Sequence, residues 1–437
     1  MTALQALLIF LISFMVVAVL FKMPVSFALG ASSLLVLAFG GYNLVTVPQF
    51  AFSGLDSFAL LAIPFYIFAG VIMEYSGISK MLIDWIKSFV GRIRGATGVI
   101  TICACMAFGV LTGSAMATIS AIGKMMVPEL EKEGYPKAYN SALLAATCFL
   151  GILIPPSVPG IMYALASGGK ISEIWMSTVG PAFIFAVGYF VINYFRIGRH
   201  QVKPEKVNVA FSEKARQIGK STFYAIPALL MPIIIYGAIY GGFFTPTEAA
   251  AVAAVYALVC GLFIYREINL KNLFSTIANA CSTNGTTMVI IGCATAFTRI
   301  LTLEQIPALV SNALIGISDN PIVILLLINL LLLFVGCFMD TTPAMMVLSP
   351  ILLPVALEMG LSAVHFGIIM VVNLAIGFIT PPLGINLFVA ARVGNTSLEV
   401  VCKGIVRFIL VMIVCLLLIT YIPAISEVLP RMTGMLK

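Results

Sequence analysis

The chain has 437 residues, of which 61% are hydrophobic and only 9% are charged, and its formal net charge is +7. Its mean hydropathy is +1.12. Because soluble domains carry about 25% charged residues, this composition excludes a soluble protein. It predicts an all-α polytopic membrane protein with room for roughly ten to twelve helices of about 20 residues.

The first apolar run extends from Leu4 to Phe21. It lacks a basic segment before it and a small-residue cleavage site after it, which predicts a retained membrane helix rather than a signal peptide. The nine cysteines lie almost all within apolar runs, so we expect no disulfide framework.

The next segments alternate apolar runs with short polar stretches. Lys22-Met23-Pro24 predicts a tight turn, since proline suits the first turn of a helix. Four further elements are predicted in chain order: a second span that ends near Gly40, a polar loop from Thr46 to Asp56, a third span from Phe58 to Glu74, and an interfacial amphipathic helix over residues 78–91 with Trp85 at headgroup depth.

A longer apolar run, residues 96–131, is interrupted at Thr112-Gly113-Ser114. Two half-length helices joined by this glycine-serine tip predict a re-entrant hairpin, and one slightly broken span is the alternative. Lys124 lies within the predicted hairpin, where it could neutralise a carboxylate or extend its ammonium group to the cytoplasmic side.

A double proline, Pro155-Pro156, interrupts the following apolar run over residues 138–168. Proline removes an amide donor and clashes with the preceding turn, so we expect the helix to unwind here. A membrane tolerates such a break only where the freed backbone is buried in protein or lines a polar cavity. An uninterrupted span from Ile174 to Phe195 and a basic cytoplasmic linker over residues 196–220 follow.

The second half of the chain repeats this plan. Without a gap, Gly134, Gly151, Pro155 and Pro156 correspond in order to Gly360, Gly377, Pro381 and Pro382. This agreement in one register indicates internal duplication. We therefore predict two repeats, residues 1–195 and 221–437, the second with a hairpin over residues 321–359 and a broken helix over residues 364–393.

Each predicted half is a five-span unit with one hairpin that returns to its own side of the membrane. An odd number of crossings inverts the second half relative to the first, which is the inverted-repeat arrangement of secondary transporters. With both termini on the periplasmic side, most of the 24 basic residues fall in cytoplasmic loops, as the positive-inside rule requires. We then expect the two hairpin tips to meet near the middle of the membrane.

Hairpin tips and helix breaks expose backbone amides, which favour anions, and carbonyls, which favour cations. A site with both suits an anionic solute carried together with a small cation such as sodium. Asp340 is the one carboxylate at a predicted tip, and an ionisable group at this depth indicates function. Its alternative role is to cap the second helix of the hairpin.

Two sets of candidate ligands follow from these positions. The predicted solute ligands are Ser114, Ser157, Asp340, Thr341, Thr342 and Asn386. The predicted sodium ligands are Gly113, Ser114, Thr118, Gly151, Pro155, Met339, Thr342, Gly377, Thr380 and Pro381. Any single hydroxyl could instead bond to its own helix. We find no other metal site, nucleotide-binding loop or catalytic triad, so we expect neither an enzyme nor an organic cofactor.

The duplicated Gly-x-x-x-Pro-Pro breaks, the Gly113-Ser114 tip, the tip from Met339 to Thr342 and the length resemble one known family. It is the DctM-like large membrane subunit of tripartite ATP-independent periplasmic (TRAP) transporters, and the resemblance covers nearly the whole chain. It implies an elevator-type, sodium-driven importer of an organic acid, such as sialic acid or a C4-dicarboxylate, in the bacterial inner membrane. In the implied architecture, the hairpins and broken helices form the moving domain. Within the family, the chain looks most like the sialic-acid members.

The resemblance also implies two protein partners, a four-helix small membrane subunit and a soluble periplasmic substrate-binding protein. Because the chain starts directly with its first span, we expect the small subunit to be a separate polypeptide, unlike in fused members. The other expected partners are the organic acid and the lipid bilayer, and no nucleic acid is expected.

Other classes of membrane protein make different demands on the sequence. A stand-alone sodium:dicarboxylate symporter would have similar hairpins but would need no binding protein. A redox or quinone-binding subunit would need haem-ligating histidines, whereas the two histidines, His200 and His365, fall outside the predicted spans. A channel is disfavoured, because broken inverted helices suit alternating access better than an open pore.

Overall fold

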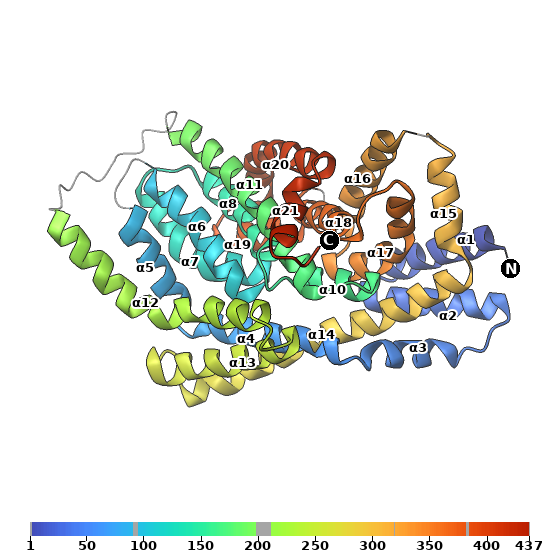
Figure 1. Cartoon of the computed structure of the whole chain (residues 1–437), viewed down its shortest axis with the longest axis horizontal. Helices are drawn as coiled ribbons and strands as arrows, with labels where there is room; N and C mark the ends of the chain where they lie inside the picture. The colour runs from blue at the N-terminus through green and yellow to red at the C-terminus, as the bar shows by residue number, and fades with distance from the viewer. Residues whose placement is uncertain (1, 91–94, 198–210, 319, 382–383, 437) are drawn as a thin grey trace.

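Figure 1 shows the computed structural model of the protein, which describes residues 2–90, 95–197, 211–318, 320–381 and 384–436. Helices account for nearly all of these residues, and no strand occurs among them. Eight helices in the described ranges are long and apolar enough to cross a membrane, and the bent pair Lys137–Leu153 and Val158–Ser167 would form a ninth span. The prediction of an all-α polytopic membrane protein is therefore confirmed.

The helices form two groups, one before and one after residues 198–210, which lie outside the described part of the chain. The first group is α1 (Ala3–Met15, continued by a π-helical turn Val16–Leu20), α2 (Val25–Gly40), α3 (Thr46–Leu55), α4 (Ala62–Tyr75, preceded by a 3-10 turn Phe58–Leu61), α5 (Ile78–Val90), α6 (Ala96–Thr112), α7 (Ala115–Lys132), α8 (Lys137–Thr147), α9 (Leu150–Leu153), α10 (Val158–Ser167) and α11 (Ile171–Ile197). The second group is α12 (Phe211–Tyr240), α13 (Pro246–Val259, continued by a π-helical turn Cys260–Ile264), α14 (Leu270–Leu303), α15 (Ile306–Ile315), α16 (Pro321–Phe338), α17 (Thr341–Glu358), α18 (Ala363–Gly377), α19 (Ile385–Val393), α20 (Leu398–Tyr421) and α21 (Ala424–Met432).

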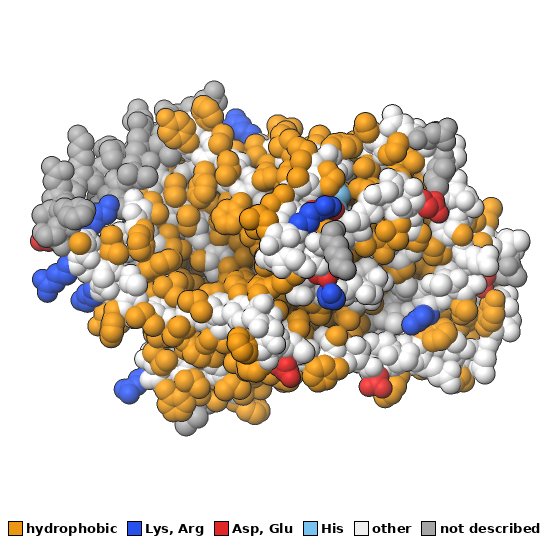
Figure 2. Space-filling model, in the orientation of Figure 1, with side chains coloured by type: hydrophobic (Ala, Val, Ile, Leu, Met, Phe, Trp, Pro, Cys, Tyr) orange, Lys and Arg blue, Asp and Glu red, His pale blue; other side chains and the backbone are white. Residues whose placement is uncertain are grey.

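The surface of the molecule is rich in large apolar side chains. In the view of Figure 2, hydrophobic side chains are exposed across much of the surface and charged ones are few and scattered. Phe243 and Phe274 are each 80% exposed. A soluble monomer rarely exposes contiguous apolar surface on this scale, whereas a membrane protein presents it to lipid.

Two segments differ from the sequence-based prediction. The predicted polar loop from Thr46 to Asp56 is wrong, because residues Thr46–Leu55 form α3. Ala51 and Gly54 of α3 pack directly on Gly292 and Thr295 of α14. This contact stabilises as a helix a segment whose polar residues suggested a loop. In the predicted linker over residues 196–220, helix α11 extends to Ile197 and α12 begins at Phe211, while residues 198–210 lie outside the described part of the chain.

Two pairs of glycines bring helices into backbone contact. Gly109 of α6 lies against Gly151 of α9, and Gly336 of α16 lies against Gly377 of α18. In each pair, a helix of a predicted hairpin crosses the helix that leads into a double-proline break. A side chain at either glycine would separate the two backbones, so these crossings depend on glycine.

The two halves of the chain also pack on each other reciprocally. Helix α10, which follows the first break, packs on α17, and α19, which follows the second break, packs on α7. Gly123 of α7 contacts both Leu144 of α8 and Val393 of α19. Each half thus covers the second helix of the other half's predicted hairpin.

The long helix α20 contacts the first turns of both α8 and α18. Gly404, near the start of α20, lies against the carbonyl of Ala138 at the start of α8. At the other end, the Thr420 carbonyl contacts the Nε2 of His365, in the first turn of α18, at 3.2 Å. The sixteen residue steps from Gly404 to Thr420 span about 24 Å, so α8 and α18 begin at opposite ends of α20.

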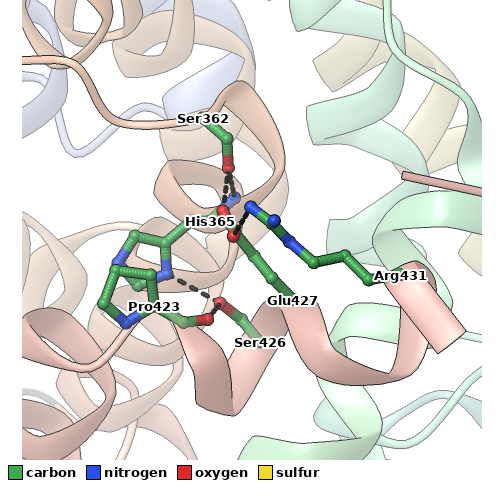
Figure 3. Close-up of polar contacts among 6 residues, drawn as sticks. All are labelled: Ser362, His365, Pro423, Ser426, Glu427 and Arg431. Carbon is green, nitrogen blue, oxygen red and sulfur yellow. Dashed lines mark hydrogen bonds and ion pairs between the residues drawn. The ribbon is translucent and has the colours of Figure 1, made fainter. Parts of the chain in front are cut away.

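A partly buried polar cluster fastens the C-terminal helix α21 to the start of α18 (Figure 3). The Ser362 hydroxyl donates to Glu427, and Arg431 forms an ion pair with the same carboxylate at 2.7 Å. The Nδ1 of His365 lies 2.7 Å from the Ser426 hydroxyl. His365 is fully buried, although the sequence placed it outside the predicted spans.

Replacing Gly377 with alanine should destabilise the protein, because the added Cβ would fall on the backbone of Gly336. Backbone cannot move aside as a flexible side chain can, so we expect a loss of about 1–3 kcal/mol. Gly237→Ala is the matched control, since no atom outside its own helical turn lies within 4 Å of that Cβ position. Thermal unfolding in detergent measures both variants, and equal melting temperatures would contradict the importance of the crossing.

Candidate functional site

The first predicted tip is a sharp turn between α6 and α7. Gly113 ends α6 with a φ of +59°, which glycine adopts without strain. The Ser114 hydroxyl then caps α7 by accepting a hydrogen bond from the Ala117 amide at 3.4 Å. Behind the tip, the Thr118 hydroxyl donates to the Ser114 carbonyl at 2.8 Å, and a Cβ at Gly151 would lie 2.7 Å from that hydroxyl.

The second predicted tip has the same plan with a carboxylate in place of the hydroxyl. Asp340 caps α17, and its Oδ1 accepts hydrogen bonds from the Thr342 amide at 3.1 Å and the Thr341 hydroxyl at 3.2 Å. The capping role that the sequence offered as an alternative is therefore confirmed. Both of these bonds end on Oδ1, so capping in this form uses one of the two carboxylate oxygens.

The first break separates α9 from α10. Ile154 is extended, Pro155 and Pro156 are joined by a cis peptide bond, and the Ser157 hydroxyl caps α10 by accepting from the Gly160 amide at 3.2 Å. The Pro155 carbonyl accepts a hydrogen bond from the Tyr236 hydroxyl of α12. This contact ties the unwound backbone to a helix of the second half.

The second break follows α18. The Thr380 hydroxyl donates to the Ile376 carbonyl at 2.7 Å, and the Thr380 amide donates to the Gly377 carbonyl at 2.9 Å. Pro382 lies outside the described residues. Helix α19 then starts at Ile385 after Gly384, whose φ is +28°.

Both tips line one cavity of about 160 Å³. Helix α4 contributes Ile67, Gly70 and Val71, and the residues flanking the breaks contribute Ile152, Val158, Pro159 and Phe378. The tips contribute Thr112, Gly113, Ser114, Ala115, Met116, Ala117, Asp340, Thr341 and Thr342. The polar groups of two segments far apart in the sequence thus face a common space.

The candidate residues divide into those that line the cavity and those that lie behind it. The lining includes Gly113, Ser114, Asp340, Thr341 and Thr342. Nine candidates are not part of the lining: Thr118, Gly151, Pro155, Ser157, Met339, Gly377, Thr380, Pro381 and Asn386.

Three of these nine residues, Thr118, Ser157 and Asn386, have polar side chains that are fully buried. The hydroxyl of Ser157 is occupied as a helix cap. By contrast, neither side-chain polar atom of Asn386, in the first turn of α19, has a hydrogen-bond partner among the described residues. An unpaired buried amide is costly, so Asn386, which the sequence predicted as a solute ligand, keeps both polar atoms available to a ligand.

The sequence analysis missed Thr283 and Thr287 of α14, which also line the cavity. Each hydroxyl donates to the carbonyl four residues earlier, at 3.0 Å for Thr283 and 2.9 Å for Thr287. The signal was available in the run from Ser282 to Thr287, which places five hydroxyl or amide side chains within an apolar helix.

The arrangement combines groups that bind anions with groups that bind small cations. The first turns of α7 and α17 direct backbone amides toward the tips, which favours an anion. Asp340 and the threonine hydroxyls supply oxygen ligands for a hard cation. No group of three or more His, Cys, Asp or Glu side chains suited to a metal ion occurs among the described residues.

Comparison with known proteins places the chain among transport permeases. Residues 11–425 match the family "Tripartite ATP-independent periplasmic transporter, DctM component". The isethionate TRAP transporter permease protein DctMQ of Oleidesulfovibrio alaskensis is 38% identical over 92% of this chain, which spans 63% of that longer relative. The C4-dicarboxylate TRAP transporter large permease protein DctM of Pseudomonas aeruginosa is 37% identical over 87% of this chain and 88% of its own. The YdaH transporter of Alcanivorax borkumensis shares the fold, with a TM-score of 0.61 over 96% of this chain and 97% of its own at 14% identity.

Gly113→Ala and Gly168→Ala form a matched pair, since both glycines end a helix with positive φ, +59° and +71°. Alanine in this conformation costs about 1–2 kcal/mol at either position. Only at Gly113 would the Cβ also clash, with the carbonyl oxygen of Pro156, because no atom lies within 4 Å of the Gly168 position. Thermal unfolding in detergent should therefore show a larger loss for Gly113→Ala, and equal losses would contradict the contact between tip and break.

Proposed function

This chain belongs to the DctM component family of tripartite ATP-independent periplasmic transporters, the multi-pass permeases of the inner membrane, and we propose that it carries an organic-acid anion into the cell with sodium. Its relatives are transporters and not enzymes. Sialic acid and C4-dicarboxylates are the proposed substrates, and the name of the isethionate relative extends the class to a small sulfonate.

One observation carries the proposal: two capped helix starts, Ser114 and Asp340, face the same cavity. The amides of these helix starts suit the carboxylate or sulfonate of the solute. The Asp340 oxygen that is free of capping bonds suits sodium or a hydroxyl group of the solute. We assign the cavity-lining hydroxyls to the solute and retain Ser157 as a buried residue that orients α10.

The sodium ions are assigned to the backbone behind the two tips. In the first half, the Ser114 carbonyl, the Thr118 hydroxyl and Gly151 lie together, which supports a cation site there. In the second half, Gly377 lies against Gly336, its carbonyl accepts from the Thr380 amide, and Asn386 has an amide oxygen without a partner among the described residues. Carbonyl and hydroxyl oxygens are ligands that a hard monovalent cation accepts.

We further propose that the two halves form an inverted repeat that moves by an elevator mechanism. The start of α8 and the start of α18 lie at opposite ends of α20, which supports entry of the two broken helices from opposite sides. The reciprocal packing of α10 on α17 and of α19 on α7 supports a common moving unit. The periplasmic location of both termini rests on the positive-inside distribution of basic residues.

The proposed partners are a small membrane subunit and a periplasmic binding protein that delivers the anion. Transport should therefore require all three components, whereas a stand-alone sodium:dicarboxylate symporter would work without the binding protein. Proteoliposomes with the purified membrane complex, supplied with labelled sialic acid, a C4-dicarboxylate or isethionate, test this directly. Uptake that needs both a sodium gradient and the binding protein supports the proposal, and uptake without either would overturn it.

Asp340→Asn should lower sodium-dependent uptake roughly 10- to 100-fold, which is the scale of a lost charge-assisted contact. Asparagine caps helices as well as aspartate does, so this variant removes the charge and keeps the start of α17. Ser114→Ala, which loses both the cap and a hydroxyl ligand, should lower uptake at least as much while the complex still assembles. Asp56→Asn is the control, since Asp56 is an exposed carboxylate outside the cavity lining. Normal uptake by both tip variants would contradict the assignment.

A further inference from the structure

Helix α14 exposes two faces of opposite character in its first half. The apolar face contains Phe274, Ala278, Cys281 and Val289. The polar face contains Asn272, Ser275, Asn279, Ser282, Thr283 and Thr286. At 100° per residue these sets lie side by side along about 20 Å of helix, so the same helix meets two different surroundings.

The polar face is costly if it contacts lipid. The hydroxyls of Ser275, Thr283 and Thr286 donate to their own helix, at 2.8 to 3.0 Å. The Asn279 side chain has no such partner among the described residues, and it lies about 14 Å along the helix from Leu270. Polar groups without partners at this depth normally face water or another protein.

The polar face leads directly into the cavity. Thr283 belongs to both, and Thr287, one turn further, also lines the cavity. Beyond this point α14 is tightly packed, because Cys293 meets Gly30 of α2 and the Thr298 hydroxyl donates to the Met346 carbonyl of α17. The exposed polar face of α14 therefore extends from the cavity toward the start of the helix. It does not continue past the cavity toward the end of the helix.

Helices α4 and α7 border the cavity beside α14 and carry charges further along the same direction. Val71 and Ala117 line the cavity, and Glu74 and Lys124 follow them by one and two turns. The Lys124 Nζ lies 4.0 Å from Glu74, and the lysine side chain is 67% exposed while the glutamate is 16% exposed. The exposed cation thus stands where the path leaves the cavity.

We propose that the polar face of α14, together with Glu74 and Lys124, lines the route by which the anionic solute leaves the cavity for the cytoplasm. The proposal rests on the proposed function and on the topology that places the start of α14 on the cytoplasmic side. Lys124 raises the local concentration of the anion at the mouth of this route, because a positive charge at a narrow opening focuses the electrostatic field. Glu74 holds the ammonium group beside the path.

A thiol-labelling experiment tests the route without depending on transport. In inside-out vesicles that contain the whole complex, and with Cys281 replaced by alanine, Asn279→Cys and Ala278→Cys are treated with the impermeant anion sulfonatoethyl methanethiosulfonate. Both positions are exposed, but only a thiol in water ionises and meets the reagent, so Asn279→Cys should react at least about tenfold faster. Equal rates at the two positions would overturn the route. So would reaction at Asn279→Cys only when the small subunit is absent, since a partner helix would then cover the face.

Substitutions at Lys124 test the electrostatic role. Lys124→Gln should slow uptake by a factor of roughly 3 to 10, and Lys124→Arg should restore it. The difference between wild type and Lys124→Gln should shrink as salt is raised, since the screening length falls to about 3 Å at 1 M. Lys80→Gln, at an exposed lysine of α5, is the control. A deficit that arginine does not repair, or that salt does not change, would show that Lys124 only holds the fold and would overturn its role.

The two proposals fail in different ways. If wild type takes up none of the organic acids while Asn279→Cys still reacts preferentially, the proposed function is wrong and the aqueous route remains. If uptake is normal but Asn279→Cys is protected, the proposed function stands and this route is wrong.

Discussion

Hydrogen bonding of the backbone inside the membrane is the constraint on which the rest of this structure depends. Lipid offers no partner to a free amide or carbonyl, so the chain can leave a helical path only where protein or water supplies one. Here it does so at two tips and two breaks. At three of these places the next helix starts with a capping side chain, Ser114, Ser157 or Asp340. A single interruption facing lipid would leave backbone groups unpaired at a cost in free energy. Because the interruptions meet at one cavity, protein and water can pair these groups.

Glycine provides the contacts that hold the interruptions together. Gly109 with Gly151, and Gly336 with Gly377, let a hairpin helix touch the helix before a break, while Gly113 lets the first tip reach Pro156. A close-packed interior moves as a unit rather than deforming locally. The same crossings that build the cavity therefore also favour motion of the hairpins and broken helices together, as the proposed mechanism requires.

The local features of the site were readable from the sequence, and their surroundings were not. Double prolines, the glycine-serine tip and an isolated Asp340 are each unusual within a membrane helix, so they can be recognised in the sequence. Thr283 and Thr287 do not, because hydroxyls bonded to their own helix are ordinary in membranes. The helix α3 was missed for a related reason: its stability comes from packing on α14, which lies far away in the chain.

By itself, the sequence determined the membrane class, the positions of the helix interruptions and the family, since composition, proline chemistry and spacing act locally along the chain. Only the tertiary structure decided that Ser114 and Asp340 face one cavity, that Ser157 is a buried cap and that Asn386 has no side-chain partner among the described residues. It also gave α14 its two unlike faces. These properties depend on which distant segments fill the space around a residue, and helical periodicity alone does not specify that packing.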